Sequence, residues 1–224
     1  MPKCSSEETH KKREEIVDAC SKLYETMPFK DITIKEIGQF TSFTRTSIYN
    51  YFSTKEEIFL ELLIRDFKLW IEDLDNIKGE GELLTVDEAA DGLAATLARR
   101  VRMLGILSMS LADMQDNCRM ANLIEFKKVY NNTGLAVRRV LKRLVPEITE
   151  EDEQSFVCAF YPFIYGLYPY TATNKKQEEA DLKAGVPCCC VCHKMFYAAR
   201  PAIKILLEDI CYSYMCECVP KKRK

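Results

Sequence analysis

The stretch TRTSIYNYFSTKEE, residues 44–57, decides the fold of this chain. It begins with small hydroxyl-bearing and cationic side chains, from Thr44 to Ser47, and passes at once into large apolar and aromatic residues such as Ile48 and Phe52. A helix with this sequence has a polar face of small side chains and an apolar face that packs inward. The STKEE that follows has the capping hydroxyls and early acids of a new helix start. Two helices are therefore predicted with almost no loop between them.

The residues before this stretch predict two more helices. Over about residues 7–26 the apolar side chains recur at helical spacing, and Pro28 ends the pattern. Thr33, followed three residues later by Glu36, fits a capping box that opens a short helix to about Phe40. Helix, short helix, tight turn and short helix is the order of a helix-turn-helix, whose second short helix enters the DNA major groove.

The rest of the chain predicts helices and no β-strand. TNKKQEEADLKAGVP, near the C-terminus, is expected to be a polar loop. The helix that follows Thr149 is apolar on every side, which predicts burial all round, with kinks at Pro162 and Pro169. The expected helices run from residue 55 to about 77, from 86 to about 107, from 120 to 145, from 149 to about 170, and from about 192 to 214.

Composition agrees with a helical globular protein. The chain has 224 residues, 47% of them hydrophobic and 29% charged, with only 8 Gly and 8 Pro. The net charge is −2, and residues 1–55 hold nine Lys and Arg against eight Asp and Glu, so any nucleic-acid binding must rest on a local patch. No apolar run approaches the roughly 20 residues of a membrane span, and the N-terminus lacks the pattern of a signal peptide. We therefore expect a cytoplasmic protein with no membrane partner.

The ordered motif IKEIGQFTSFTRTSIYNYFSTKEEIF resembles the N-terminal domain of the TetR (tetracycline-repressor-like) family of bacterial transcriptional regulators. The resemblance implies an all-α fold. An N-terminal helix-turn-helix three-helix DNA-binding domain would occupy residues 1–54, and a larger all-helical ligand-binding and dimerisation domain would occupy residues 55–224. Three residues depart from the pattern, namely Gly38, Thr41 and Ser42. Ser42 replaces the usual Gly of the turn and would carry roughly 1 kcal/mol of strain if the turn needs a positive φ.

The resemblance further implies a homodimeric, ligand-responsive transcriptional regulator, a repressor, that binds double-stranded operator DNA. Arg45 is the best candidate for a base-edge contact, since a guanidinium suits guanine O6 and N7. Thr33 and Lys55 stand at helix starts, where phosphate is attracted. The predicted DNA-binding residues are Thr33, Thr44, Arg45, Thr46, Ser47, Tyr49, Asn50, Tyr51 and Lys55.

By the same resemblance, the C-terminal part would form the homodimer through the last two helices, about residues 152–170 and 193–214, and would bind an unknown small-molecule effector. The alternative is that both helices belong to the core of a monomer and that the aromatic and Met side chains are ordinary core. No cofactor is predicted, and two His and no Gly-rich phosphate loop argue against an enzyme. The predicted pocket residues are Trp70, Met103, Met109, Met114, Phe126, Tyr130, Phe160 and Tyr165.

The eleven cysteines leave a second function open. CCCVCH at residues 188–193 and CYSYMCEC at 211–218 suit a metal- or thiol-redox-responsive sensor whose input is this C-terminal cluster. The spacing is poor for zinc, because three of the cysteines are contiguous, and free Cys is also a common buried residue. No metal site is predicted. A third alternative, a helical dimer that has lost DNA reading, rests on Ser42 alone.

Overall fold

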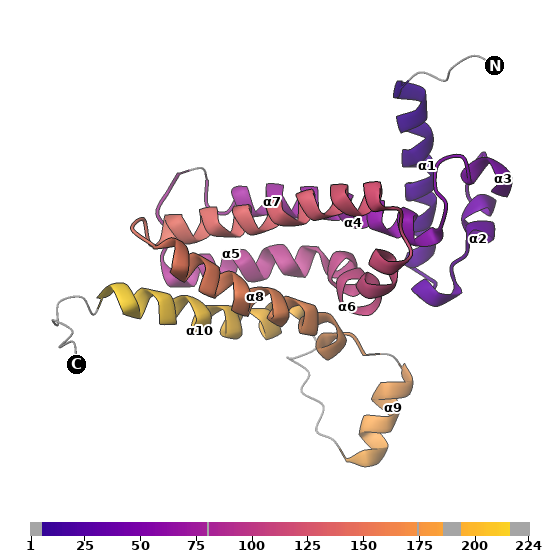
Figure 1. Cartoon of the computed structure of the whole chain (residues 1–224). Coiled ribbons are helices and arrows are strands. Elements are labelled where there is room, and N and C mark those ends of the chain that lie inside the picture. Colours follow the sequence, from indigo (N-terminus) through magenta and orange to yellow (C-terminus); the bar gives the residue numbers. More distant parts are fainter. Residues whose placement is uncertain (1–5, 80, 174, 186–193, 216–224) are drawn as a thin grey trace. The chain divides into compact units, whose positions relative to one another are not determined.

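Every element of the chain is helical in the part that the computed structural model describes, residues 6–79, 81–173, 175–185 and 194–215 (Figure 1). The all-α expectation is therefore confirmed. The elements are α1 (Ser6–Tyr24), the 3₁₀ turn η1 (Phe29–Asp31), α2 (Ile34–Gln39), α3 (Arg45–Ile48), α4 (Lys55–Asp75), α5 (Val86–Arg99), α6 (Val101–Asp116), α7 (Met120–Leu144), α8 (Glu150–Thr171), α9 (Lys175–Ala184) and α10 (Met195–Met215). None of them is long and apolar enough to cross a membrane within the described ranges.

The chain divides into two compact units. The first, here called the head, comprises Met1–Phe67 and Ser110–Tyr130. The second, the body, comprises Lys68–Met109 and Asn131–Lys224. The helices α4, α6 and α7 each give residues to both units, so the head is built from two separate stretches of sequence.

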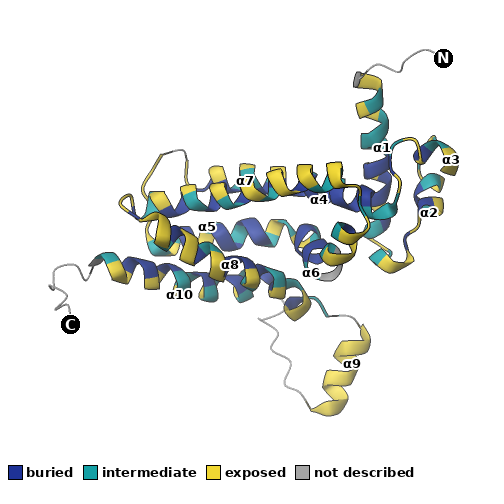
Figure 2. Ribbon diagram, viewed as in Figure 1, coloured by how far each residue is buried: buried dark blue, intermediate teal, exposed yellow. Residues whose placement is uncertain are grey.

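The head is held together by apolar side chains from its first four helices. Ile16 of α1, Ile37 of α2 and Ile48 of α3 have no exposed surface, and the same is true of Phe52 and Phe59. Figure 2 shows this buried side of each helix in dark blue. Burying a side chain of this size contributes about 1.5–3 kcal/mol. The apolar half of the quoted stretch is thus the anchor that its pattern predicts.

The turn between α2 and α3 adopts an ordinary backbone at Ser42. Among the described residues, Lys78 is the non-glycine residue with a positive φ, so the strain considered for Ser42 does not arise. The Ser42 N–H donates to Glu15 Oε1 at 2.7 Å, and the Thr41 hydroxyl donates to the Gly38 carbonyl at 3.2 Å. These hydrogen bonds support the turn with Ser42 at the position where the family pattern has Gly.

The body packs α10 against α5 and α8 (Figure 1). Two pairs of buried polar groups form hydrogen bonds in its interior: the Trp70 indole N–H donates to the Thr96 hydroxyl at 3.0 Å, and the Thr133 and Tyr161 hydroxyls lie 2.5 Å apart. Paired groups of this kind cost little to bury. The interior of the body is therefore a satisfied core in these two places.

The prediction of one long helix over residues 86–107 is wrong, because the helix is interrupted at Arg100. Its backbone angles, φ −112° and ψ 39°, leave the helical region. The guanidinium donates to Asp73 Oδ2 at 2.7 Å and to the Leu69 carbonyl at 3.2 Å. These tertiary contacts fix the break, and the sequence pattern alone carries no sign of them.

The loop expected over TNKKQEEADLKAGVP is also wrong in part, since α9 occupies residues 175–184. Its residues are good helix formers, and Lys183 pairs with Glu179 one turn earlier at 2.6 Å. Gly185 follows with φ +68°, the left-handed conformation that ends many helices. The polarity of the segment correctly indicated that it is exposed. It did not justify the prediction that the segment has no helix.

The composition of α8 predicted that the helix is buried on every side, and this prediction is wrong. Phe156, Phe160, Ile164 and Leu167 are buried, but a stripe on the other side is exposed. That stripe contains small and ring-bearing residues at helical spacing: Cys158, Ala159, Pro162, Gly166, Pro169 and Tyr170.

Candidate nucleic-acid interface

Three threonines cap the helices that carry the predicted DNA-binding residues. Thr33 accepts the N–H of Lys35 at 3.2 Å before α2, and Thr44 accepts the N–H of Ser47 at 3.2 Å before α3. Thr54 does the same before α4, accepting the N–H of Glu57 at 3.3 Å. Replacing such a cap by Ala typically costs about 1 kcal/mol. The hydroxyls therefore have a structural role, and each makes a further contact: Thr33 donates to Glu36, Thr54 donates to the Asn117 carbonyl, and the Thr44 hydroxyl lies 2.9 Å from that of Ser47.

Arg45 lies on the exposed side of α3 beside Tyr49. One of its terminal nitrogens donates to Tyr49 Oη at 3.3 Å, and the guanidinium carbon lies 5.8 Å from the ring centroid. This hydrogen bond raises the pKa of Arg45 above its ordinary value, so the side chain keeps its charge. Both residues are exposed. The pair presents a fixed cation with donors to spare, which suits a base edge or a phosphate.

Lys55, at the first position of α4, is partly engaged by the head itself. Its ammonium donates to the Phe29 carbonyl at 2.8 Å and lies 4.3 Å from the centroid of the Phe29 ring. An ammonium has three protons to donate, and these contacts use one of them. Lys55 thus fixes the 3₁₀ turn before α2 while its charge stays at the surface.

Four of the predicted residues line one open hollow of about 420 Å³. The hollow collects two hydroxyl groups of cap residues, a tyrosine, three cations and one carboxylate from η1–α2, α3 and the start of α4. Its lining residues are Thr33, Ile34, Lys35, Arg45, Tyr49, Ser53, Thr54, Lys55 and Glu56. Hydroxyls and an excess of cations are the groups that commonly contact the phosphates of a DNA backbone.

The other predicted residues lie outside this hollow. Thr44, Thr46 and Asn50 are exposed. Ser47 and Tyr51 are half-buried: the Ser47 hydroxyl lies 2.9 Å from that of Thr44, and the Tyr51 ring lies 6.2 Å from the Phe43 ring.

Lys35 belongs to the hollow but is absent from the sequence-based set. It is exposed in the first turn of α2, next to the capping Thr33. The signal was present in the sequence, as a cation two residues after the cap.

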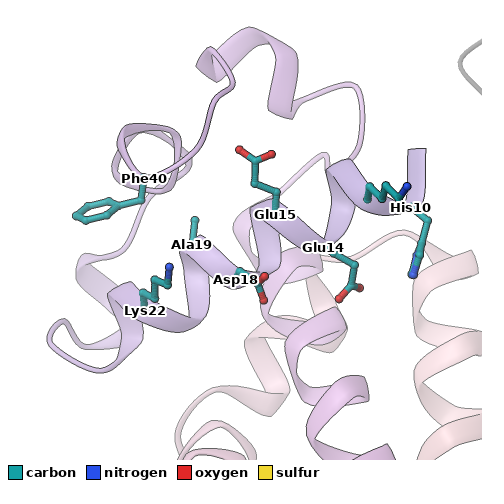
Figure 3. A pocket seen from close by; sticks show the side chains of 8 residues that line it. His10, Glu14, Glu15, Asp18, Ala19, Lys22 and Phe40 are labelled. Atoms are coloured by element: carbon teal, nitrogen blue, oxygen red, sulfur yellow. The ribbon is translucent and has the colours of Figure 1, made fainter. Parts of the chain in front are cut away.

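A second hollow of the head, about 480 Å³, has the opposite character (Figure 3). Glu14, Glu15 and Asp18 of α1 lie along it, with Phe40 from the end of α2. Arg65 donates to Glu14 and to Asp18, each at 2.6 Å, so the acids serve the packing of α1 on α4. Lys11 and Lys22 also line this hollow, so its three carboxylates are partly balanced, but it lacks the excess of cations found in the hollow that holds Arg45.

The predicted pocket residues are divided between the two units. Met114, Phe126 and Tyr130 belong to the head, where Phe126 and Tyr130 stack with centroids 5.9 Å apart. Trp70, Met103, Phe160 and Tyr165 belong to the body, and the first three are fully buried. The side chain of Met109 lies outside the described residues. The two hollows of the head, and an apolar hollow between α8 and α10, are lined by other residues.

The cysteine cluster at residues 188–193 and the cysteines after residue 215 lie outside the described residues. In the described ranges no group of three or more His, Cys, Asp and Glu is arranged to hold a metal ion. Burial raises the pKa of the Cys118 and Cys211 thiols above the ordinary value. Protonated thiols are poor nucleophiles, so these two cysteines do not support redox sensing.

Comparisons with known proteins cover nearly the whole chain. Residues 16–62 match the family model described as "Bacterial regulatory proteins, tetR family", and residues 64–189 match "Tetracyclin repressor-like, C-terminal domain". Among solved structures, the fatty acid degradation regulator FadR from Bacillus halodurans is similar, with a TM-score of 0.52 and 13% sequence identity. The match covers 88% of this chain and 94% of that one, and at this identity it shows the fold. Curated protein sequences gave no significant match.

Proposed function

Because the chain belongs to the TetR family of bacterial regulatory proteins and is a DNA-binding transcriptional regulator, we propose that it acts as a homodimeric, ligand-responsive repressor. In this proposal the head reads operator DNA with α3 as its recognition helix. The observation that carries the proposal is the hollow where Thr33, Arg45, Tyr49 and Lys55 converge from three elements. A regulator that reads chromosomal DNA works in the cytoplasm of its bacterium, which agrees with the expectation from the sequence.

The residues of this surface divide into two roles. Arg45 contacts base edges, since its guanidinium is charged, exposed and two-pronged. Thr33, Tyr49 and Lys55 contact phosphates, because a hydroxyl or an ammonium carries no base code but positions the protein on the duplex. Thr46 and Asn50 extend the exposed side of α3 and its following turn toward the groove.

The apolar surface between α8 and α10 supports the homodimer. It forms a hollow of about 500 Å³, lined in part by Tyr197, which is 54% exposed. Beyond the hollow, α10 exposes Ile205 at 65% and Tyr212 at 70%. Exposed apolar surface of this extent marks protein interaction sites. Two copies joined through α8 and α10 would form a four-helix bundle. The lining residues are Pro162, Phe163, Gly166, Leu167, Tyr170, Tyr197, Ala198 and Pro201.

A dimer suits DNA geometry, because two recognition helices about 34 Å apart read the two halves of a pseudo-palindrome. The effector would act by shifting the population of conformations. A ligand that prefers a conformation with wrongly spaced recognition helices weakens DNA binding, typically by 1–3 kcal/mol. The large buried side chains of the body, Trp70, Met103 and Phe160, are the proposed surroundings of that ligand.

The proposal is tested by selection from a random duplex library with the full chain, followed by measurement of the molar mass in solution. We expect an enriched pseudo-palindrome and the mass of a dimer. Recovery of unenriched sequences, in spite of a folded and dimeric protein, would rule out operator reading. A monomeric mass with sequence-specific binding would rule out the dimer alone.

A further inference from the structure

A buried carboxylate contacts the turn between α3 and α4. Glu57, in the first turn of α4, has no exposed side-chain surface. Its two oxygens accept four hydrogen bonds: Ser53 N–H at 2.8 Å, and Arg119 through Nε at 2.6 Å, through a terminal nitrogen at 2.7 Å and through its backbone N–H at 3.1 Å. Burial raises the pKa of Glu57, but the hydrogen bonds from Arg119 and Ser53 outweigh it, and the pKa lies below its ordinary value. The carboxylate is therefore charged and fully paired.

The same short segment, residues 117–119 between α6 and α7, makes two further contacts with the turn between α3 and α4. A terminal nitrogen of Arg119 donates to the Tyr51 carbonyl at 3.4 Å, and the Thr54 hydroxyl donates to the Asn117 carbonyl at 3.1 Å. We call this set of contacts among Tyr51, Thr54, Glu57, Asn117 and Arg119 the turn clamp. It joins residues that lie more than sixty positions apart in the sequence.

The turn clamp behaves as one unit for an electrostatic reason. The Arg119 side chain is 55% exposed, but removing it would leave the buried Glu57 carboxylate uncompensated, which is costly. The guanidinium is held in two-pronged geometry, which fixes direction as well as distance. Glu57 and Arg119 are therefore expected to act as a pair.

The recognition helix depends on such outside support. The helical part of α3 is four residues long, Arg45–Ile48, far below the length at which a helix is stable alone. One more turn follows, closed by the Phe52 N–H donating to the Ile48 carbonyl at 3.0 Å. Ile48 and Phe52 anchor it from below, and the turn clamp holds the end from which the chain enters α4. A small displacement of this end would move the exposed side chains of α3.

We propose that Arg119 is a positioning residue for DNA binding, which holds the turn between α3 and α4, and with it the recognition helix, through Glu57. The inference rests on the proposed function, since it assumes that α3 reads DNA. Arg119 acts through Glu57 and the Tyr51 carbonyl and makes no contact with the nucleic acid.

The test uses the full chain and the duplex that the wild-type protein enriches from a random library. Dissociation constants are measured from 50 to 300 mM salt for wild type, Arg119→Ala, Arg119→Lys, Glu57→Gln and the double variant Glu57→Gln/Arg119→Ala. Arg65→Ala is the matched control, because Arg65 also forms ion pairs within the head, but its partners are Glu14 and Asp18 of α1 and not residues of the turn. Circular dichroism and thermal unfolding establish that each variant is folded.

We expect Arg119→Ala to weaken DNA binding about tenfold, the size of a typical coupling between contacting residues. Arg119→Lys keeps the charge but loses the two-pronged geometry, so it should recover part of that loss. The slope of affinity against salt should stay unchanged in both, because no phosphate contact is removed. In the Glu57→Gln background, Arg119→Ala should add less than about twofold, and Arg65→Ala should bind within about twofold of wild type.

Three results would overturn the proposal. A salt slope lower by about one in Arg119→Ala would mean that Arg119 itself binds a phosphate. An equal loss in both backgrounds would mean that the effect does not pass through Glu57. Undiminished binding by Arg119→Ala would mean that the turn needs no clamp. If Arg119→Ala fails to fold, Arg119→Lys decides the matter, and wild-type affinity in that variant overturns the proposal. If the wild-type protein prefers no DNA sequence, the proposed function is wrong, and this outcome is distinct from the three above.

Discussion

The hollow of the head that holds Arg45 and the hollow between α8 and α10 are similar in size, about 420 Å³ and about 500 Å³. Their chemistry is opposite. The first gathers Thr33, Arg45 and Lys55 around helix starts. The second is lined by Pro, Gly, Ala, Leu and aromatic side chains. A charged hollow recognises its partner by electrostatics and an apolar one by burial. One chain therefore carries two exposed surfaces whose responses to solution conditions should differ.

The largest expected difference is in salt dependence. DNA affinity should fall about 10³- to 10⁵-fold between 50 and 200 mM salt if the dimer contacts six to ten phosphates, because condensed counterions are released on binding. The dimer dissociation constant should change by less than about threefold over the same range, since apolar burial is not screened. Fluorescence anisotropy and sedimentation velocity on the same samples measure the two. If the dimer dissociation constant depends on salt as steeply as the DNA dissociation constant does, the distinction between a charged and an apolar surface is contradicted.

The next largest effect is expected from a charge placed on the apolar surface. Ile205→Asp should convert the dimer to a monomer and lower DNA affinity about 100-fold or more, because two linked recognition helices bind far better than one. Leu83→Asp is the matched control: Leu83 is 64% exposed and Ile205 65%, but Leu83 lies in the loop before α5. Sedimentation velocity gives the mass. If both variants stay dimeric, the interface lies elsewhere.

A smaller effect on the charged surface concerns base preference. Arg45→Ala should cost about 1–3 kcal/mol on the preferred duplex and relax the choice of base at one position in each half-site. Selection from a library randomised at single positions measures this directly. A uniform loss across all positions would instead assign Arg45 to the phosphate backbone.

The smallest predicted effect separates phosphate contacts from base contacts. Lys35→Ala should weaken binding several-fold on every duplex and reduce the salt slope by about one per protomer, as the loss of a phosphate contact does. Lys30→Ala is the comparison, because Lys30 is an exposed lysine of η1 that does not line the hollow. Titration of each variant at four salt concentrations gives the slopes. An unchanged slope in Lys35→Ala would remove Lys35 from the interface.

The head could be predicted closely from the sequence because its signals are local. The cap at Thr33, the cap at Thr44 and the buried anchors Ile48 and Phe52 all follow from residue type and short spacing. The resemblance to the TetR family is confirmed by matches over both parts of the chain. Ser42 is instructive, because a hydrogen bond to Glu15, twenty-seven positions away, supports the turn that the local pattern left in doubt.

The features that sequence analysis missed depend on distant partners. The break at Arg100 is fixed by Asp73 and by the Leu69 carbonyl. The two-sided character of α8 follows from which of its faces meets α10, and composition averages over both faces. Arg119 has no motif around it that marks it as the partner of a carboxylate sixty-two positions earlier. Periodicity predicts which residues face inward but not which residue they meet.

The shared helices of the two units have a consequence for protein engineering. A fragment that ends at residue 54 would keep every side chain proposed to contact DNA except Lys55 but would lose Phe59, whose ring lies 5.3 Å from Tyr24 and 4.7 Å from Phe29. It would also lose residues 110–130, which belong to the head. Exchange of DNA specificity between relatives should therefore be attempted by grafting the exposed side chains of α3 into an intact chain. A transplanted fragment of residues 1–54 would lack the residues of α4, α6 and α7 that complete the head.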